Sequence, residues 1–218
     1  MSRDSVLALL ETFDQEAEEV KPYSLQSVQY PIQRSWFENN GVASSELIQY
    51  SSSLIVSVPN ASCITFFGGI THPASRGSVH IASSDPLSPP IIDPKFLSHD
   101  FDAQALLNIL KFVQSIAQEP PLSEVVAAQV SPDVNNQSDD ELVEYIRSTS
   151  ANGDHLIGTA AMAAQELGGV VDSSLRVYGT RNLRVVDASI FPLHISAHIQ
   201  ATVYAIAEKA AAMIKAGQ

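Results

Sequence analysis

Hydrophobic residues recur at helical spacing in three stretches of the chain. In residues 3–20 the apolar stripe consists of Val6, Leu9, Leu10, Phe13 and Ala17. A second helix is predicted over residues 100–119, which two prolines follow, and a third over the alanine-rich residues 201–215. Ser138 and Glu141 have the spacing of a capping box, which predicts a shorter helix between the last two.

Runs rich in β-branched and aromatic residues predict strands at 47–58, 63–69, 77–83 and 182–192. In the third run, Val79 and Ile81 alternate with small or polar residues, as in a strand with one buried face. The hydrophobic pattern between the first helix and the first strand is less regular, and Pro22 and Pro31 interrupt it. Helices are too few for regular βαβ units. We therefore expect an α+β fold, a mostly antiparallel sheet flanked by helices, with a C-terminal strand and helix.

Composition narrows the range of partners. The chain has 218 residues, of which 45% are hydrophobic, and this is typical of a globular protein with a real core. Its net charge of −12 argues against nucleic acid and anionic membranes as partners. A single cysteine, Cys63, excludes an intrachain disulfide. The acidic first residues lack the apolar core of a signal peptide, and no apolar run is long enough to span a membrane, so we expect a cytoplasmic location.

Two histidines near the C-terminus lie in distinctive sequence. His155 begins HLIGTAAM, His198 lies in ISAHIQATVYAIAEKAA, and GGVVDSSLRVYGTRNLRVVDASIFP (168–192) runs between them. Upstream lies THPASRGSVHIASSDPLSPPIIDP (71–94), followed by the long predicted helix. An imidazole with a pKa of about 6.5 can take or give a proton at neutral pH. Two converging imidazoles can divide the work, one accepting a substrate proton and the other donating to a developing oxyanion.

These segments together resemble the substrate domain and C-terminal segment of the glucose-methanol-choline (GMC) flavoprotein oxidoreductases. The resemblance covers residues 65–218 and is weaker over 25–64. It divides the chain into an N-terminal helix (1–24), a substrate-domain-like part (25–150) and a C-terminal segment (151–218), which we expect to form one compact unit. In that family the positions of His155 and His198 face the reactive edge of a flavin. The resemblance implies that His155 is the base for an alcohol hydroxyl and that His198 assists it.

The resemblance also implies which residues would face a flavin. Asp187 and Ala188 would lie along its ribityl and pyrophosphate, and Gln200 and Ala201 would point at its pyrimidine ring from the start of the last helix. A helix N-terminus favours negative charge there. The family's front part, however, carries a G-x-G-x-x-G turn for the ADP half of FAD, and this sequence has none. We therefore expect no cofactor on this chain alone, and FAD only where a partner supplies the ADP-binding domain.

Other residues have two interpretations each. His194 could join the two histidines, or it could have a surface or structural role. Phe66 and Tyr204 could line an apolar substrate pocket, or they could pack in the core. A zinc site from His155, His194 and His198 lacks a cysteine or nearby carboxylate to complete it, so we predict no metal.

Three functions agree with the sequence. The first is cofactor-independent acid–base catalysis, such as isomerisation, dehydration or cyclisation, on an apolar, oxygen-bearing small molecule. The second is one part of a split FAD-dependent alcohol oxidase or dehydrogenase acting on CH–OH donors, and the third is a non-catalytic binding remnant. In the family the last strand and helix pack against the FAD domain. Here we expect the helix over residues 3–20, a second copy of the chain or an FAD-domain partner to cover them.

Overall fold

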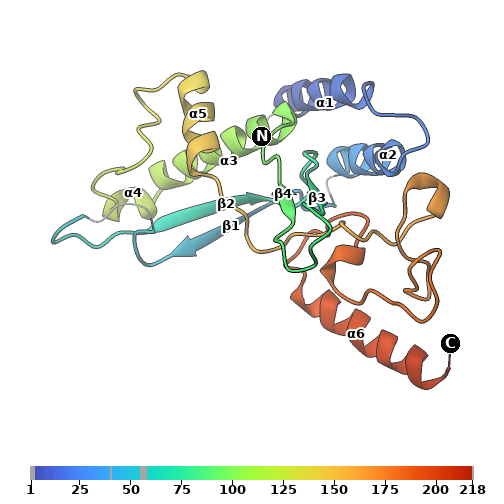
Figure 1. Ribbon diagram of the computed structural model, residues 1–218. Helices are drawn as coiled ribbons and strands as arrows, with labels where there is room; N and C mark the ends of the chain where they lie inside the picture. Colours follow the sequence, from blue (N-terminus) through green and yellow to red (C-terminus); the bar gives the residue numbers. More distant parts are fainter. Residues whose placement is uncertain (1–2, 40, 55–57, 218) are drawn as a thin grey trace.

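The computed structural model describes residues 3–39, 41–54 and 58–217 (Figure 1). The side chain of Val6 and residues 55–57 of the predicted strand 47–58 lie outside the described part. The elements in chain order are α1 (Arg3–Ala17), α2 (Leu25–Glu38), β1 (Ser45–Tyr50), β2 (Thr65–Ile70), β3 (Ser78–His80), β4 (Ile91–Asp93), α3 (Asp100–Gln118), α4 (Leu122–Val125), α5 (Asp139–Thr149), η1 (Gln165–Leu167), η2 (Ala188–Ile190) and α6 (Gln200–Lys215). Both η elements are single turns of 3₁₀ helix.

The described strands form two antiparallel pairs, β1 with β2 and β3 with β4. In the first pair Ser45 lies opposite Ile70, and Tyr50 lies opposite Thr65. Helix α3 packs closely on β2. A Cβ atom added to Gly68 would lie only 2.5 Å from the Ile109 side chain, so glycine allows this approach. The expected α+β class, with antiparallel strands flanked by helices, is confirmed.

Helix α2 was missed because it contains Pro31, which cannot donate the backbone hydrogen bond of a helix interior. Its start is fixed by Ser24, whose side chain accepts a hydrogen bond from the Ser27 N–H. Arg34 ties it to α1 through an ion pair of 2.7 Å with Asp14. Burial of Tyr30 and other side chains of the same face against α1 and α3 therefore outweighs the lost bond.

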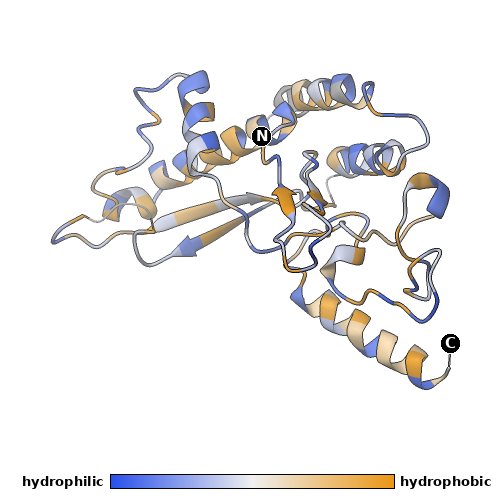
Figure 2. Ribbon diagram, in the orientation of Figure 1, coloured by the Kyte–Doolittle hydropathy of each residue, from blue (hydrophilic) through white to orange (hydrophobic). Residues whose placement is uncertain are grey.

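Two strand expectations were wrong in detail. Val79 and Ile81 are 45% and 89% exposed, so the apolar face of the β3–β4 pair lies on the surface. Figure 2 shows the hydrophobic character of β4. Residues 182–192 form no strand. Within the described residues this segment has one isolated bridge, between Arg184 and Arg176, and it then turns into η2. The turn begins where Asp187 accepts a hydrogen bond from the Ser189 N–H, which ends the extended backbone.

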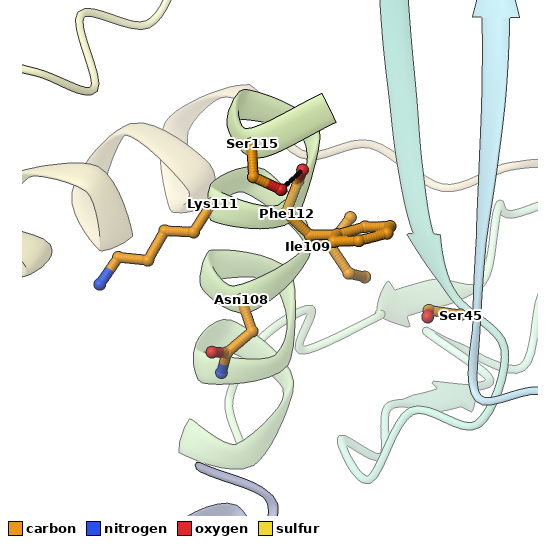
Figure 3. Close-up of a pocket in the computed structure, with 6 residues that line it drawn as sticks. All are labelled: Ser45, Asn108, Ile109, Lys111, Phe112 and Ser115. Carbon is orange, nitrogen blue, oxygen red and sulfur yellow. Dashed lines mark hydrogen bonds between the residues drawn. The ribbon is translucent and has the colours of Figure 1, made fainter. Parts of the chain in front are cut away.

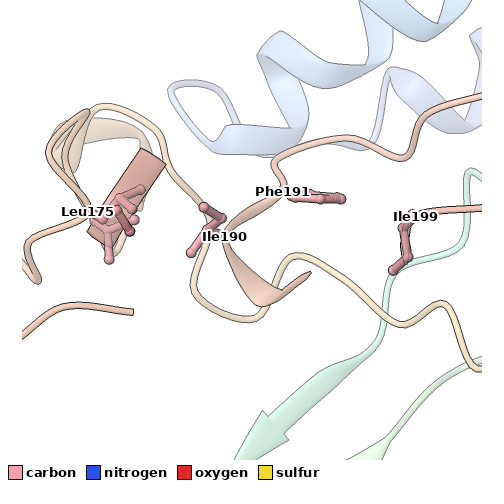
Figure 4. Close-up of a cluster of buried hydrophobic side chains, with 6 residues drawn as sticks. Leu175, Ile190, Phe191 and Ile199 are labelled. Carbon is pink, nitrogen blue, oxygen red and sulfur yellow. The ribbon is translucent and has the colours of Figure 1, made fainter. Parts of the chain in front are cut away.

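Buried apolar side chains fall into three clusters within the described residues. One joins α1, α2 and α3 around Phe13, and a second joins α3 to α5 around Leu142. The third belongs to the C-terminal segment and contains Leu175, Ile190, Phe191 and Ile199 (Figure 4). Helix α6 packs on this third cluster, whereas α1 lies at the far side of the molecule (Figure 1). The N-terminal helix therefore does not cover the C-terminal segment, contrary to one expectation.

Candidate active site

The two motif histidines contact each other. His155 Nε2 lies 2.6 Å from His198 Nδ1, and the ring centroids are 4.7 Å apart with the planes at 89°. His155 is half-buried and His198 is exposed. The expectation that these two side chains converge is confirmed, although they are far apart in the sequence.

Backbone pairing places His155. The strip that follows it is held against η2 by the Ala160 N–H, which donates to Ser189 O at 2.9 Å, and by the Met162 N–H, which donates to Ile190 O at 2.8 Å. Next to this strip, Gly169 packs so closely that a Cβ atom there would lie 2.0 Å from Ala163 O. The segment beginning at His155 is therefore fixed by the C-terminal segment itself.

A carboxylate completes the arrangement from a different part of the chain. Glu46 Oε2 on β1 lies 3.2 Å from His198 Nε2. Sequence reasoning missed Glu46 because the contact spans most of the chain. The available signal was weak: Glu46 shares the less exposed face of β1 with Ile48, an unusual place for an unpaired carboxylate.

These contacts are consistent with one assignment of protons to the ring nitrogens of the two histidines. If the Glu46 carboxylate accepts a hydrogen bond from His198 Nε2–H, then Nδ1 of the same ring is an acceptor. His155 Nε2 then donates to that acceptor, which leaves the lone pair on His155 Nδ1 to take a proton. The arrangement can therefore move a proton along a line of three side chains.

His194 lies beside the pair. Its ring centroid is 6.4 Å from that of His155, and its Nδ1 is 2.9 Å from Ile195 O, an acceptor that orients the ring. Among the residues with described placement, no group of three or more histidine, cysteine or acidic side chains is arranged to hold a metal ion.

The four residues expected to face a flavin lie at two turns that flank the histidines. Asp187 caps η2 and Ala188 begins it, while Gln200 and Ala201 begin α6. Asp187, Gln200 and Ala201 are exposed. No described side chain caps the first turn of α6, so its N–H groups could receive an electron-rich ring. The start of α6 at Gln200 and Ala201 therefore fits the ring end of a flavin. For the ADP half, the described strands provide only antiparallel pairs and no parallel strand–turn–helix cradle.

The residues expected to line an apolar pocket are not gathered together. Tyr204 is 68% exposed on α6, and Phe66 is half-buried on β2. A surface pocket of about 430 Å³ instead lies between α3 and β1, where Ile109 and Phe112 point towards the strands and Lys111 points away (Figure 3). None of the three expected residues, Phe66, His194 and Tyr204, lines this pocket.

A buried polar network supports the turn that precedes β3. Both carboxylate oxygens of Asp102, which is 1% exposed, accept backbone hydrogen bonds of 2.8 Å from Ala74 and Ser75. Arg76 donates to Gln33 Oε1 at 2.7 Å and to Pro73 O at 2.7 Å. Burial lowers the pKa of the Arg76 guanidinium, and the nearby charge of Asp102 opposes that shift. The network fixes the Pro-Ala-Ser-Arg-Gly turn between α2 and α3.

Comparison with known proteins gives the same family as the motifs. The family model described as GMC oxidoreductase matches residues 73–207, which is more than half of the chain. A dehydrogenase of Armillaria gallica is 42% identical over 88% of this chain and 30% of its own length. Versicolorin B synthase of Aspergillus parasiticus is 42% identical over 67% of this chain and 23% of its own.

Solved structures agree. An FAD-dependent oxidoreductase from Chaetomium thermophilum matches with a TM-score of 0.81 and 27% identity, over 98% of this chain and 36% of its own. The chain thus spans between about a quarter and about a third of the length of these relatives. By its motifs, its fold and the match over residues 73–207, the chain belongs to the GMC oxidoreductase family.

Proposed function

We propose that His155 and His198 form an acid–base couple that acts on an apolar, oxygen-bearing small molecule. The reaction is a proton transfer without a redox step: isomerisation, dehydration or cyclisation. The observation that carries this proposal is the contact of 2.6 Å between the two imidazoles, with Glu46 behind the second ring.

The mechanism follows the line of side chains. His155 Nδ1 accepts a proton from the substrate, and the proton on its Nε2 passes across the short contact to His198 Nδ1. The positive charge that results on His198 lies next to the Glu46 carboxylate, which stabilises it. His198 then has two N–H groups, one directed at Glu46 and the other at His155 Nε2, and its positive charge stabilises an oxyanion that develops on the substrate.

One relative carries a name that is not that of an oxidase or a dehydrogenase. Versicolorin B synthase is named for a synthase activity, and it is 42% identical over 67% of this chain. This name motivates the proposal of a reaction other than alcohol oxidation, although the chain covers only 23% of that relative. The transfer of that chemistry to this chain is part of the proposal.

The test is proton exchange, because it needs no knowledge of the product. The purified chain is incubated in deuterium oxide with a panel of aryl hydroxyketones, and deuterium uptake beside the carbonyl is followed by mass spectrometry. His155→Ala and His198→Ala should each lower the exchange rate by roughly 10²–10⁴-fold, the usual contribution of a positioned acid or base. The control is His80→Ala, which alters an exposed histidine on β3. Equal exchange in all four proteins would reject the proposal.

A second candidate is FAD-dependent oxidation of CH–OH donors, with the ADP-binding domain supplied by another polypeptide. It is favoured by the exposed turns at Asp187 and Gln200 and by the exposure of Tyr204 on α6. A bound FAD would supply the hydride acceptor for an alcohol C–H bond, while His155 would take the hydroxyl proton. The partner would also cover apolar side chains that are now in contact with water.

The two candidates differ in flavin retention. The chain is mixed with FAD, passed through gel filtration and examined for the visible flavin absorption band. A stoichiometric band would favour the redox function, and its absence combined with exchange activity would favour the first proposal. Light scattering on the same sample reports whether the chain is a homodimer, the other proposed cover for the C-terminal segment. A chain with neither flavin nor exchange activity would be the binding remnant.

A further inference from the structure

A fourth histidine, His72, lies beneath the loop that carries His198. His72 is 3% exposed and follows directly after β2 and Thr71. Its Nε2 lies 2.8 Å from Ser196 Oγ. The indole of Trp36 on α2 lies against the same imidazole, with ring centroids 4.7 Å apart. His72 is therefore a buried polar side chain in a fixed orientation, and its bond partner is two residues from His198.

The loop from Phe191 to Ile199 packs on the cluster of the C-terminal segment through Phe191, Ile195 and Ile199. Phe191 and Ile199 are buried in the cluster of the C-terminal segment, whereas Ser196, Ala197 and His198 are exposed. The described hydrogen bonds and ion pairs that reach this loop from outside the C-terminal segment come from three side chains. Gln29 Nε2 donates to Pro192 O, His72 contacts Ser196, and Glu46 contacts His198. Among these contacts, the hydrogen bond between His72 and Ser196 is the one closest in sequence to His198 that leaves the His198 ring uninvolved.

We propose that His72 is a positioning residue for the proton-transfer site: through Ser196 it fixes the loop that aims His198 at His155. This inference rests on the proposed acid–base function for its catalytic consequence, but the geometric part stands without it. If the bond to Ser196 is lost, residues 196–198 lose a constraint, and the contact of 2.6 Å between the two imidazoles should lengthen.

The chemistry of His72 suits this role. Among the described residues its Nδ1 has no hydrogen-bond partner. A buried N–H without an acceptor costs more than a buried acceptor without a donor, because the carbonyls and hydroxyls of a protein leave many acceptor sites unfilled. We therefore assign the proton of the neutral ring to Nε2, where Ser196 Oγ accepts it, and the backbone of His194 forms a further hydrogen bond with the ring. Burial lowers the pKa of His72, which keeps the ring neutral and this donor in place at neutral pH.

Two pairs of variants separate positioning from simple packing. Ser196→Ala removes the acceptor at an exposed position, so folding should be unaffected, and Ser196→Thr keeps the hydroxyl. His72→Leu removes the donor, and His72→Gln places an amide N–H near the position of Nε2. Ser115→Ala is the control, since Ser115 lies on the exposed side of α3 and bonds only within its own helix among the described contacts.

The first readout is independent of activity. Long-range nitrogen–proton NMR correlations of histidine-labelled protein give the protonation state of each imidazole nitrogen. Ser196→Ala and His72→Leu should shift the signals of His155 Nε2 and His198 Nδ1, while Ser196→Thr, His72→Gln and Ser115→Ala should leave them unchanged. Unchanged signals in Ser196→Ala would overturn the inference, even if His72→Leu failed to fold.

The second readout is the exchange reaction. A misplacement of about 1 Å can cost as much as 10²-fold in rate, so Ser196→Ala should lower kcat by roughly 10- to 100-fold with little change in KM. The conservative variants should restore it. If NMR shows the displacement but His155→Ala leaves exchange unchanged, the positioning stands and the proposed function fails. If His155→Ala abolishes exchange but Ser196→Ala alters neither readout, the function stands and the positioning fails.

Discussion

Glu46 Oε2 lies 3.2 Å from His198 Nε2, the ring nitrogen opposite the one that contacts His155. A hydrogen bond from His198 Nε2–H to this carboxylate leaves Nδ1 of the same ring as the acceptor for His155 Nε2–H. It comes from β1, whereas both imidazoles belong to the C-terminal segment.

Replacement of Glu46 should reduce proton transfer without abolishing it. In Glu46→Gln the amide can donate as well as accept, so the tautomer of His198 is no longer fixed and its positive charge is not neutralised. We expect the exchange rate to fall by roughly 10- to 100-fold, less than on loss of a group that takes the proton itself. Glu144→Gln on the exposed face of α5 is the matched control. An unchanged rate in Glu46→Gln would show that the carboxylate does not act on the pair.

The burial of His72 should make stability depend on pH. Burial lowers the pKa of His72 from the ordinary value of 6.5; a hydrogen bond with the His194 backbone opposes this shift, and the charge of His194 adds to the lowering to a smaller extent. The folded state therefore binds fewer protons than the unfolded state below about pH 6.5. The contribution of the neutral His72 ring to the free energy of unfolding is fully present above about pH 6.5, and it is lost as the pH falls below that value. The drop in Tm from about pH 7.5 to about pH 5.5 should be smaller in His72→Gln than in the unmodified chain. Equal drops would contradict the prediction.

Asp102 should be important for stability rather than for chemistry. Asp102→Ala leaves the backbone N–H groups of Ala74 and Ser75 without their acceptor in a buried site. The expected loss in the free energy of unfolding is about 3 kcal/mol, measured by urea denaturation. Asp140→Asn, an exposed change in the first turn of α5, should stay within about 0.5 kcal/mol.

Gly169 should tolerate no side chain. In Gly169→Ala the new Cβ atom meets the Ala163 carbonyl at 2.0 Å, so the backbone next to the His155 strip must move. We expect a loss of about 1–3 kcal/mol, as is usual for overpacking, measured by thermal or chemical denaturation. Gly153→Ala is the control, because nothing lies within 4 Å of its Cβ position. A Gly169→Ala protein as stable as the control would contradict the structure at this point.

Local signals in the sequence were sufficient for most helices. The apolar period predicted α1, α3 and α6, and the capping box at Ser138 predicted the start of α5. They failed for α2, where the energy of burying Tyr30 outweighs the proline at position 31. They also failed for Val79 and Ile81, because alternation indicates a two-sided strand but does not identify which side is covered.

The candidate site was predicted in part. The neighbours of His155 and His198 in the sequence identified both through the resemblance to a family, and the structure brings them into contact. Glu46 and Ser196 could not be found in this way. Their partners are 152 and 124 residues away along the chain, and neither pair leaves a local pattern of spacing.

The separate apolar cluster of the C-terminal segment gives the site a mechanical property. Both imidazoles belong to the segment that contains that cluster, whereas Glu46 lies on β1 and His72 follows β2. A small rotation of the C-terminal segment relative to the β1–β2 pair would break the contact between Glu46 and His198, and both parts would stay folded. A substrate that contacts both parts would hold them together, so the rate of proton transfer would rise with the fraction of chains that have substrate bound.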